Sequence, residues 1–514
     1  MARPVISEDR PAGRLRPRRP APLRIRVGDA RLPAVVWVLA GVQLVATLFY
    51  SFVQPQTPVR LVRGSAALIE QSAFWSAVTR LPWPVPRGGL SLALALLVMG
   101  VVAFAGYGAA VAVCWNRPAT RRALLAVALS GMAFMTLSAL ALPTQSSDIY
   151  DYILKGRMAT VYGVNPYQVA PDEFPDDPLY PYASGQFTVH PEKKPPTWIY
   201  VTIAWSALAG DDPVTNLLVY RFGFLALNLL NVALIIAFLR RWRPEALLAG
   251  VALYAWNPIV ILHGQAKTDT LMTSFVLLAA VLLFAGRRHG SAAALGLSMF
   301  VKLLTLPLLA VTFFGELGAR RWRSVVLSGL AVALAVTVIY IPVASGPGLI
   351  LQHLGELRRG GSDLPRAFSL PVMLGAAGLV AWAGVASRGK PERVLGAWAL
   401  VAVCFAVFFN PLAFSWYLLV PLALVSLTAE WRLTVVTGVL SFLAFLANSW
   451  DTSTSPRFPL PKPDGLNRPV AFLAVIALTA AAAGAVLWFS SRRRNRTSPR
   501  ETPSELETES EAAR

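Results

Sequence analysis

The chain has 514 residues, of which 55% are hydrophobic and only 14% are charged, and its mean hydropathy is +0.54. A soluble globular protein carries about 25% charged residues, so a chain of this length cannot cover its surface with polar groups in water. The composition indicates a membrane protein and excludes a disordered chain, a collagen-like fibre and a disulfide scaffold. The two cysteines, Cys114 and Cys404, lie in apolar segments and indicate no redox chemistry.

The excess of positive charge is large, with 47 Lys and Arg against 27 Asp and Glu and a formal net charge of +20. In a soluble protein this excess would raise the question of a nucleic-acid partner. Here the basic residues lie in short segments between apolar blocks and in the two tails, where the enrichment of Lys and Arg in cytoplasmic loops explains them. We therefore expect a lipid bilayer and no nucleic acid as the partner of this chain.

Residues 1–33 form an Arg- and Pro-rich arm without the form of a cleaved signal peptide, so the first apolar block, 34–53, is expected to be a retained span. Further apolar blocks of about 17 to 25 residues, the length that crosses a bilayer as a helix, follow along the chain. With the basic clusters placed in the cytoplasm, the pattern predicts about 12 to 14 transmembrane helices and both termini in the cytoplasm. The other spans assigned individually are 89–114, 122–143, 246–263, 269–286, 323–345, 367–387, 393–410, 415–428, 432–448 and 470–490.

Three segments depart from this simple alternation. The apolar stretch 195–210 is expected to be a surface or re-entrant helix, because a further span would place the basic cluster at Arg240 outside. The block 290–315 lies between two basic loops and is expected to form either a hairpin of two short helices meeting near Lys302 or a re-entrant element. An amphipathic stretch on the membrane surface near 64–81 is our interpretation of an outer segment that carries several arginines.

The chain is therefore expected to be an all-α polytopic protein with one membrane domain, residues 34–490. Its longest outer loop, 144–213, is expected to carry juxtamembrane helices, and the later outer loops are 346–366 and 449–468. Residues 491–514, rich in Pro, Thr, Ser and Glu, are expected to be a disordered cytoplasmic tail.

The outer loop that begins at residue 144 concentrates ionisable and aromatic residues directly after a span. A carboxylate at the end of a span can lie beside both a lipid-borne phosphate and a hydroxyl acceptor, where a general base is needed. Asp148 and Asp151 occupy such positions. The alternative for Asp148 is a helix N-cap, because Ser-Ser-Asp precedes an apolar-periodic run.

Further along this loop, Pro195 and Pro196 break the chain just before the expected surface helix. The break leaves Lys193 and Lys194 at the interface, where they either neutralise a phosphate or extend into solvent. His190 could pair with a carboxylate, but a lone histidine is a poor metal site, and we expect no metal.

Charged residues at membrane depth are energetically expensive and therefore informative. The Trp-Asn-Pro break at 256–258 is followed by Lys267 and Asp269, which open the next span from the outside. Lys302 lies in an otherwise apolar run. Structural alternatives are a helix cap for Asp269 and a hairpin tip for Lys302. The pair Trp416-Tyr417, at an outer interface, is typical of an aromatic belt or of a sugar-binding surface.

The order of these motifs resembles that of bacterial polytopic glycosyltransferases of the GT-C class, and in particular the polyprenol-phosphate-mannose-dependent (alpha-1,6-)mannosyltransferases that build lipoglycans. The resemblance covers about residues 144–430 in order; the series of motifs is specific, and no single motif is. The matching elements are Asp148-Ile149-Tyr150, Lys155-Gly156-Arg157, Gly163-Val164-Asn165-Pro166-Tyr167, Pro195-Pro196, Trp256-Asn257-Pro258 with Asp269, Lys302 with Pro307, and Trp416-Tyr417.

The resemblance implies a polyprenyl phosphate sugar as donor, a glycan or lipoglycan as acceptor, no cofactor, and an active site outside the plasma membrane. It makes Asp148 the catalytic base, with Asp151 second because the family pattern varies there. The implied reaction is one inverting displacement of a hexose. The substrate-binding residues implied or suggested by position are Tyr150, Tyr152, Lys155, Arg157, Asn165, Tyr167, His190, Lys193, Lys194, Lys267, Asp269, Lys302, Trp416 and Tyr417.

Two departures from the family pattern leave the donor sugar open. Lys267-Thr268-Asp269 stands where members often have His-Asn-Asp, and Lys194 stands where a tyrosine often precedes the two prolines. The second departure makes the element similar to the Lys-Pro-Pro of lipid-linked arabinosyl and protein mannosyl transferases.

Proteins of other classes share part of this pattern. A transporter or flippase of lipid-linked sugars would bind at the membrane midplane, whereas the polar residues here gather at the outer surface. A lipid-linked oligosaccharide ligase or polymerase would use His and Arg in a late outer loop, for which His353, Arg358 and Arg359 are candidates. A non-catalytic assembly subunit is the third alternative.

Overall fold

The structure is a computed structural model, and within the residues it describes the chain is helical with no β-strand. The prediction of an all-α polytopic membrane protein is confirmed. The predicted span 470–490, the tail 491–514 and most of the two late outer loops lie outside the described residues. These residues are 28–56, 65–86, 89–143, 147–343, 366–408 and 414–453.

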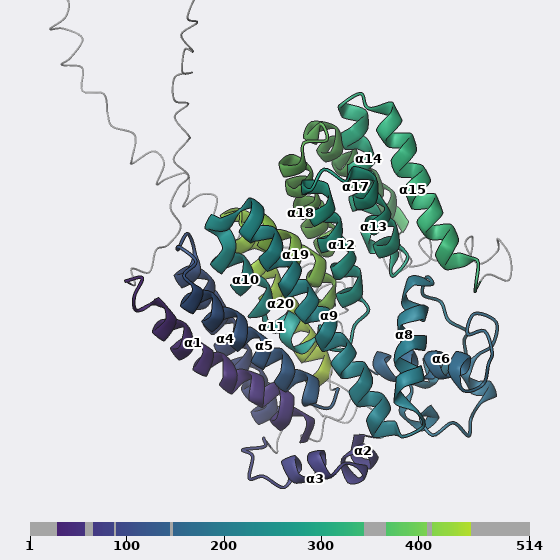
Figure 1. Cartoon of the computed structure of the whole chain (residues 1–514). Helices are drawn as coiled ribbons and strands as arrows, with labels where there is room; N and C mark the ends of the chain where they lie inside the picture. Colours follow the sequence, from purple (N-terminus) through teal and green to yellow (C-terminus); the bar gives the residue numbers. More distant parts are fainter. Residues whose placement is uncertain are drawn as a thin grey trace, which may run out of the picture.

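Six of the described helices are long and apolar enough to cross a membrane. The first of them, α1, continues into a π-helical segment, Phe49–Val53, and a 3-10 turn, Gln54–Gln56. In Figure 1 α1 and α4 lie at one side of the bundle, α15 lies at the other, and α9 passes between them. The six are α1 (Leu32–Leu48), α4 (Gly89–Cys114), α5 (Arg121–Leu140), α9 (Pro213–Trp242), α15 (Trp322–Tyr340) and α20 (Trp431–Ser453).

Shorter helices complete the bundle. Of the two alternatives for residues 290–315, the structure has the pair of short helices, α13 and α14, joined by the 3-10 turn Leu303–Thr305 directly after Lys302. The remaining bundle elements are the 3-10 turn Pro244–Ala246, α10 (Leu247–Ala255), α11 (Pro258–Leu262), α12 (Asp269–Phe284), α13 (Arg288–Met299), α14 (Leu306–Gly318), α17 (Arg366–Ser387), α18 (Pro391–Phe408), the 3-10 turn Ser415–Leu418 and α19 (Leu419–Thr428).

The predicted span 246–263 is broken, as its Trp-Asn-Pro motif indicates. Helix α10 ends before Trp256, and the Asn257 side chain caps α11 by accepting from the Ile259 N–H. A break inside a membrane is stable only where neighbouring side chains satisfy the freed backbone groups. Where the chain leaves the helix again after α11, Asn228 of α9 does so by donating to the Gly264 carbonyl at 3.0 Å.

The long outer loop folds into short helices at one end of the bundle (Figure 1). Helix α6 crosses α8 at Gly156, where an added Cβ would lie 2.6 Å from the Thr202 carbonyl oxygen and 2.6 Å from the Tyr220 hydroxyl. Only glycine permits this approach. The elements are α6 (Asp148–Thr160), 3-10 turns at Pro171–Glu173 and Tyr180–Tyr182, α7 (Gly185–Thr188) and α8 (Thr197–Ala209). The stretch expected at the membrane surface near 64–81 forms two short helices, α2 (Ser65–Gln71) and α3 (Ala73–Thr79).

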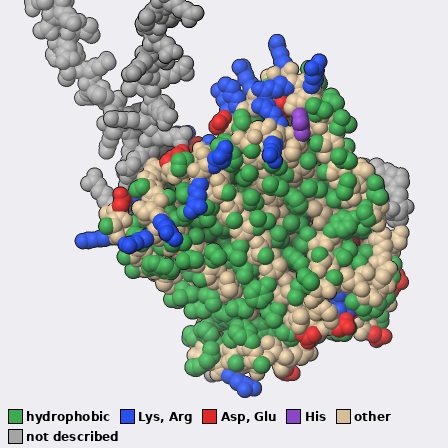
Figure 2. Space-filling model, viewed as in Figure 1, with side chains coloured by type: hydrophobic (Ala, Val, Ile, Leu, Met, Phe, Trp, Pro, Cys, Tyr) green, Lys and Arg blue, Asp and Glu red, His purple; other side chains and the backbone are tan. Residues whose placement is uncertain are grey.

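Charge is distributed unevenly along the bundle. Figure 2 shows Lys and Arg side chains gathered at its upper end, a largely hydrophobic surface below them, and acidic side chains concentrated at the lower right, in the region of α6. This separation is what the enrichment of basic residues in cytoplasmic loops predicts for a multi-pass membrane protein.

Candidate active site

The first element of the site is an ion pair between the outer loop and the bundle. Asp148 is the first residue of α6, and Ser147 precedes it as the N-cap; Asp148 therefore lies in the first turn and not at the capping position considered above. The Lys267 Nζ donates to Asp148 Oδ2 at 2.7 Å and lies 3.6 Å from the centre of the Trp416 ring. Burial lowers the pKa of Lys267, while Asp148 opposes this shift.

A second pair repeats this arrangement next to the first. Asp269, the first residue of α12, accepts from the Lys302 Nζ at 3.2 Å. The same amine lies 3.8 Å from the centre of the Tyr417 ring. Since Trp416 and Tyr417 are neighbours in one 3-10 turn, two lysines from different segments lie over adjacent aromatic rings, an arrangement stabilised by cation–π attraction.

A third group lies around Asp151, one turn after Asp148. Its carboxylate lies 3.3 Å from the Lys155 amine and 3.3 Å from the Lys194 amine. Burial raises the pKa of Asp151, although both lysines oppose the shift. Glu192 Oε1 accepts from the backbone N–H groups of the next two residues. Burial alone would lower the pKa of Lys194, but the nearby carboxylates, chiefly that of Glu192, raise it above its ordinary value.

Tyr152 connects these groups. Its hydroxyl lies 3.5 Å from Asp148 Oδ2, and the Lys194 amine lies 4.9 Å from the centre of its ring. The structure thus brings together residues from five separate segments of the sequence, as the motif series predicts. They are Asp148, Asp151, Tyr152 and Lys155 from α6, Lys194, Lys267 with Asp269, Lys302, and Trp416 with Tyr417.

Arg157 does not contribute to this cluster, which corrects the expectation that it is a substrate-binding residue. Its side chain is buried and donates to Asp177 at 2.8 Å, to Asp211 at 2.9 Å and to the Gly210 carbonyl at 2.7 Å. Through these bonds the guanidinium holds the outer loop, at Asp177 and at Gly210 and Asp211, against α6. A guanidinium committed to two carboxylates is not available to a ligand.

Other residues predicted for the site act in the outer loop itself. Tyr150 is fully buried with its ring stacked on Tyr182. Asn165 closes a turn by accepting from the Tyr167 backbone N–H, and the Tyr167 hydroxyl donates to the Lys194 carbonyl at 2.8 Å. The Tyr167 bond thus fixes the backbone at Lys194, and the Tyr150 ring packs inside the outer loop.

Two further predicted residues, His190 and Lys193, are exposed on the outer loop. Neither side chain makes a hydrogen bond or an ion pair with the part of the chain that the structure describes. The same part of the chain has no group of three or more His, Cys, Asp and Glu side chains placed to hold a metal ion.

Sequence reasoning missed two buried residues beside the cluster. Arg221 of α9 donates to the carbonyls of Ser138, Ala139 and Gln265, and so joins the end of α5 to the loop that carries Lys267. His263 Nδ1 is hydrogen bonded to Ser415 Oγ, directly before Trp416. The sequence did contain a signal for Arg221, because a charged residue inside an apolar span often marks a functional site.

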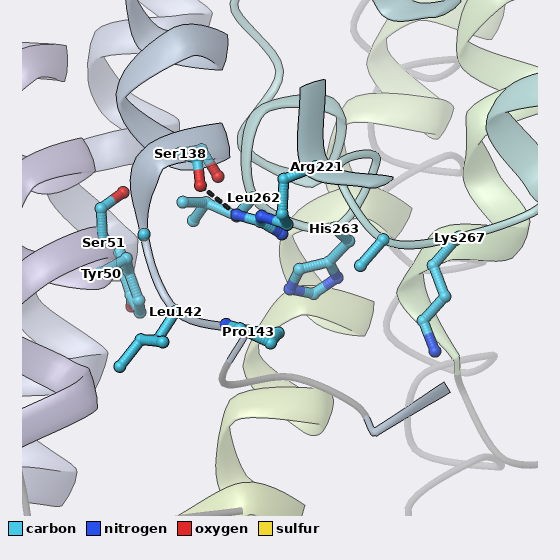
Figure 3. A pocket seen from close by; sticks show the side chains of 11 residues that line it. Tyr50, Ser51, Ser138, Leu142, Pro143, Arg221, Leu262, His263 and Lys267 are labelled. Atoms are coloured by element: carbon cyan, nitrogen blue, oxygen red, sulfur yellow. Dashed lines mark hydrogen bonds between the residues drawn. The ribbon is translucent and has the colours of Figure 1, made fainter. Parts of the chain in front are cut away.

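Two cavities flank the cluster. One has an open space of about 430 Å³ and is lined by Tyr50, Ser51, Arg221, His263 and Lys267, among others (Figure 3). The other has an open space of about 300 Å³ between α14, α18 and α19. It is lined mostly by apolar side chains and reaches Tyr417, on whose ring Lys302 lies. The cluster is therefore reached by one cavity of mixed polar and apolar lining, at Lys267, and by one mostly apolar cavity, at Tyr417.

A helical membrane domain with a cluster of carboxylates, lysines and aromatic rings at one end defines a polytopic membrane enzyme. Residues 61–320 match the family model described as "Alpha-(1->6)-mannopyranosyltransferase, N-terminal domain". This match covers just over half of the chain, so the chain belongs to this family and is a glycosyltransferase. It also confirms the resemblance to GT-C mannosyltransferases.

All the lysines and carboxylates of the cluster lie within the matched residues, whereas Trp416 and Tyr417 lie beyond them. No curated protein matches the chain. No solved structure matches it either.

Proposed function

We propose that this protein transfers mannose from a polyprenyl phosphate sugar to an extracytoplasmic glycan or lipoglycan, with inversion, and that Asp148 is the general base. The observation that carries the proposal is the apolar cavity that ends at Tyr417, beside the amine of Lys302. An apolar space that opens next to a cation suits a lipid tail joined to a phosphate, and a nucleotide-linked sugar has no use for it.

Exposure supports Asp148 over Asp151 as the base. The Asp148 side chain is 27% exposed, whereas that of Asp151 is 3% exposed and is enclosed by two lysines. A general base must come within hydrogen-bond reach of the proton that it removes. Its exposure leaves Asp148 able to meet this condition, and its bond to Lys267 fixes the direction of the carboxylate.

Exposure also separates the lysines by role. Lys194 and Lys302 are 32% and 31% exposed, so their amines can still meet a ligand, while Lys267 is 2% exposed and serves Asp148. Lys194 and Lys302, with the exposed Lys193, are suited to hold the phosphate of the donor. Their charges would stabilise the negative charge that the phosphate gains as it leaves.

The reaction follows from these placements. The acceptor hydroxyl loses its proton to Asp148 while its oxygen forms a bond to the anomeric carbon of the donor sugar. The bond from that carbon to the phosphate oxygen breaks on the opposite side, and both of its electrons remain with the polyprenyl phosphate. One displacement of this kind inverts the anomeric centre. The basic end of the bundle is proposed to face the cytoplasm, which puts this site on the outer side of the plasma membrane.

The donor class is tested in membranes that contain the full-length protein. Labelled mannose is offered either as polyprenyl phosphate mannose or as a nucleotide-linked sugar, and labelled glycan product is counted. We expect product from the lipid-linked donor alone. Two results would contradict the proposal. One is product from the nucleotide-linked sugar when the protein has been purified away from other membrane enzymes. The other is no product from any polyprenyl phosphate sugar.

A further inference from the structure

The cavity beside Lys267 is lined by residues that lie far apart in the sequence, from Tyr50 to Lys267. Figure 3 shows the His263 ring between Arg221 and Lys267, across an open space from Tyr50 and Ser51. Tyr50 and Ser51 belong to the π-helical segment that ends α1. Such segments are rare and occur often at functional sites.

Two side chains that line this cavity are buried without a hydrogen-bond partner for one polar atom. They are Ser51, which is 3% exposed, and His263, which is 1% exposed; the atoms are Ser51 Oγ and His263 Nε2. A buried polar atom left unpaired costs about 1–3 kcal/mol, and folded proteins contain few of them. Two such atoms on facing walls of one cavity indicate a ligand that pairs with both.

The character of the free groups identifies the ligand class. Lys267 is paired with Asp148, and the Arg221 guanidinium donates to three backbone carbonyls. The two groups with an unpaired atom, a hydroxyl and one imidazole nitrogen, are neutral and can form hydrogen bonds with hydroxyl groups of a ligand. The Tyr50 ring, Leu142 and Pro143 add apolar surface for the C–H groups of a sugar ring.

We propose that this cavity is the acceptor-sugar subsite, in which Ser51 and His263 bind hydroxyl groups of the accepting mannose residue. The proposal rests on the function proposed above. Lys267 lines the cavity and binds Asp148, so a sugar held there lies beside the proposed base, whereas the apolar cavity reaches the cluster at Tyr417. His263 and Ser51 would thus determine acceptor specificity without contacting the donor.

The test measures sugar binding and catalysis separately on the full-length protein in detergent micelles. Binding of α-(1→6)-linked mannobiose is followed by saturation-transfer NMR, and the donor side is followed by hydrolysis of polyprenyl phosphate mannose without acceptor. The variants are Ser51→Val, which fills the cavity, and His263→Gln. The matched control is His289→Gln, because His289 Nδ1 also pairs with a serine, Ser328, but directly after the basic pair Arg287-Arg288.

The proposal predicts that the wild type and His289→Gln bind mannobiose, that Ser51→Val loses binding at least tenfold, and that the control His289→Gln keeps wild-type donor hydrolysis. It also predicts a rise in KM for the acceptor in His263→Gln. Equal mannobiose binding in all four proteins, or no binding by the wild type, would overturn the subsite. Absence of donor hydrolysis in the wild type would instead contradict the proposed donor, and the binding result would still decide the subsite.

Discussion

Lys267 and Asp148 form a 2.7 Å ion pair that joins two segments 119 residues apart in the sequence. Asp148 begins the first helix of the outer loop, and Lys267 lies in the loop between two helices of the bundle. The buried lysine cannot leave its carboxylate without losing its main charge compensation. The pair therefore fixes the outer loop against the bundle at the position where the base is proposed to act.

The first prediction concerns this pair. Lys267→Met should lower transfer about 100-fold, because a carboxylate without its partner loses the position from which it acts. The acidic limb of the pH–rate profile should move to higher pH, because a carboxylate that loses a nearby positive charge binds its proton more tightly. Initial rates over a pH series measure both effects. An unchanged profile, matching the control Lys390→Met at the exposed basic end, would contradict this role.

The second prediction concerns the contact between α6 and α8. Gly156→Ala places a methyl group within 2.6 Å of the Thr202 carbonyl oxygen, so α6 must move away from α8. We expect a loss of stability of about 1–3 kcal/mol and reduced transfer, because α6 carries Asp148. Thermal unfolding in detergent measures the first effect. Gly41→Ala, where an added Cβ meets nothing within 4 Å, is the control and should leave stability nearly unchanged.

The third prediction is a pH dependence of stability that comes from Glu192. Burial raises the pKa of Glu192, but Lys194, Lys155 and two backbone N–H groups outweigh burial and hold the pKa below 4.5. A carboxyl group of this kind stabilises the fold above its unfolded pKa and loses that contribution as the pH falls through its folded pKa. Glu192→Gln should therefore cost about 3 kcal/mol at pH 7.

Below about pH 4.5 the difference between Glu192→Gln and the wild type should shrink as the pH is lowered. Thermal unfolding at pH 7, 5, 4 and 3 measures it. The exposed Glu245 supplies a control, Glu245→Gln, which should match the wild type throughout. A difference that stays constant from pH 7 to pH 3 would show that Glu192 does not stabilise the fold through its charge.

The sequence was sufficient to predict much of the fold, because spans and basic loops repeat a simple pattern. The break at Trp256 and the short helices meeting near Lys302 were readable from proline and charge inside apolar runs. The motif series also predicted residues that the structure brings together, such as Lys267 and Trp416. The resemblance to a known family predicted that these residues lie together. The periodicity of the apolar residues did not.

Other features depended on side-chain packing that no local pattern records. Arg157 has the charge expected of a phosphate ligand, but Asp177 and Asp211 come from distant parts of the loop and occupy it. Ser51 and His263 have no motif of their own, and they become informative only when the fold leaves a polar atom of each unpaired in one cavity.

The fourth prediction concerns the lipid part of the donor. Ala402 lines the apolar cavity, and Ala402→Phe should occupy space proposed for the polyprenyl chain. Displacing about two CH2 groups at about 0.8 kcal/mol each corresponds to roughly a tenfold rise in KM for the donor. Steady-state rates at varied donor concentration measure it, with KM for the acceptor unchanged. Leu334→Phe, on the exposed face of α15, is the control; a donor KM that does not differ between the two variants would sink the assignment.

The central claim, that Asp148 is the general base for transfer from a lipid-linked sugar, is tested most directly by one comparison. Membranes with equal amounts of wild-type, Asp148→Asn and Asp151→Asn protein receive labelled polyprenyl phosphate mannose and acceptor, and the initial rate of glycan labelling is measured. We predict that Asp148→Asn falls at least about 100-fold, with Asp151→Asn less affected. Transfer by Asp148→Asn at the wild-type rate would contradict the account.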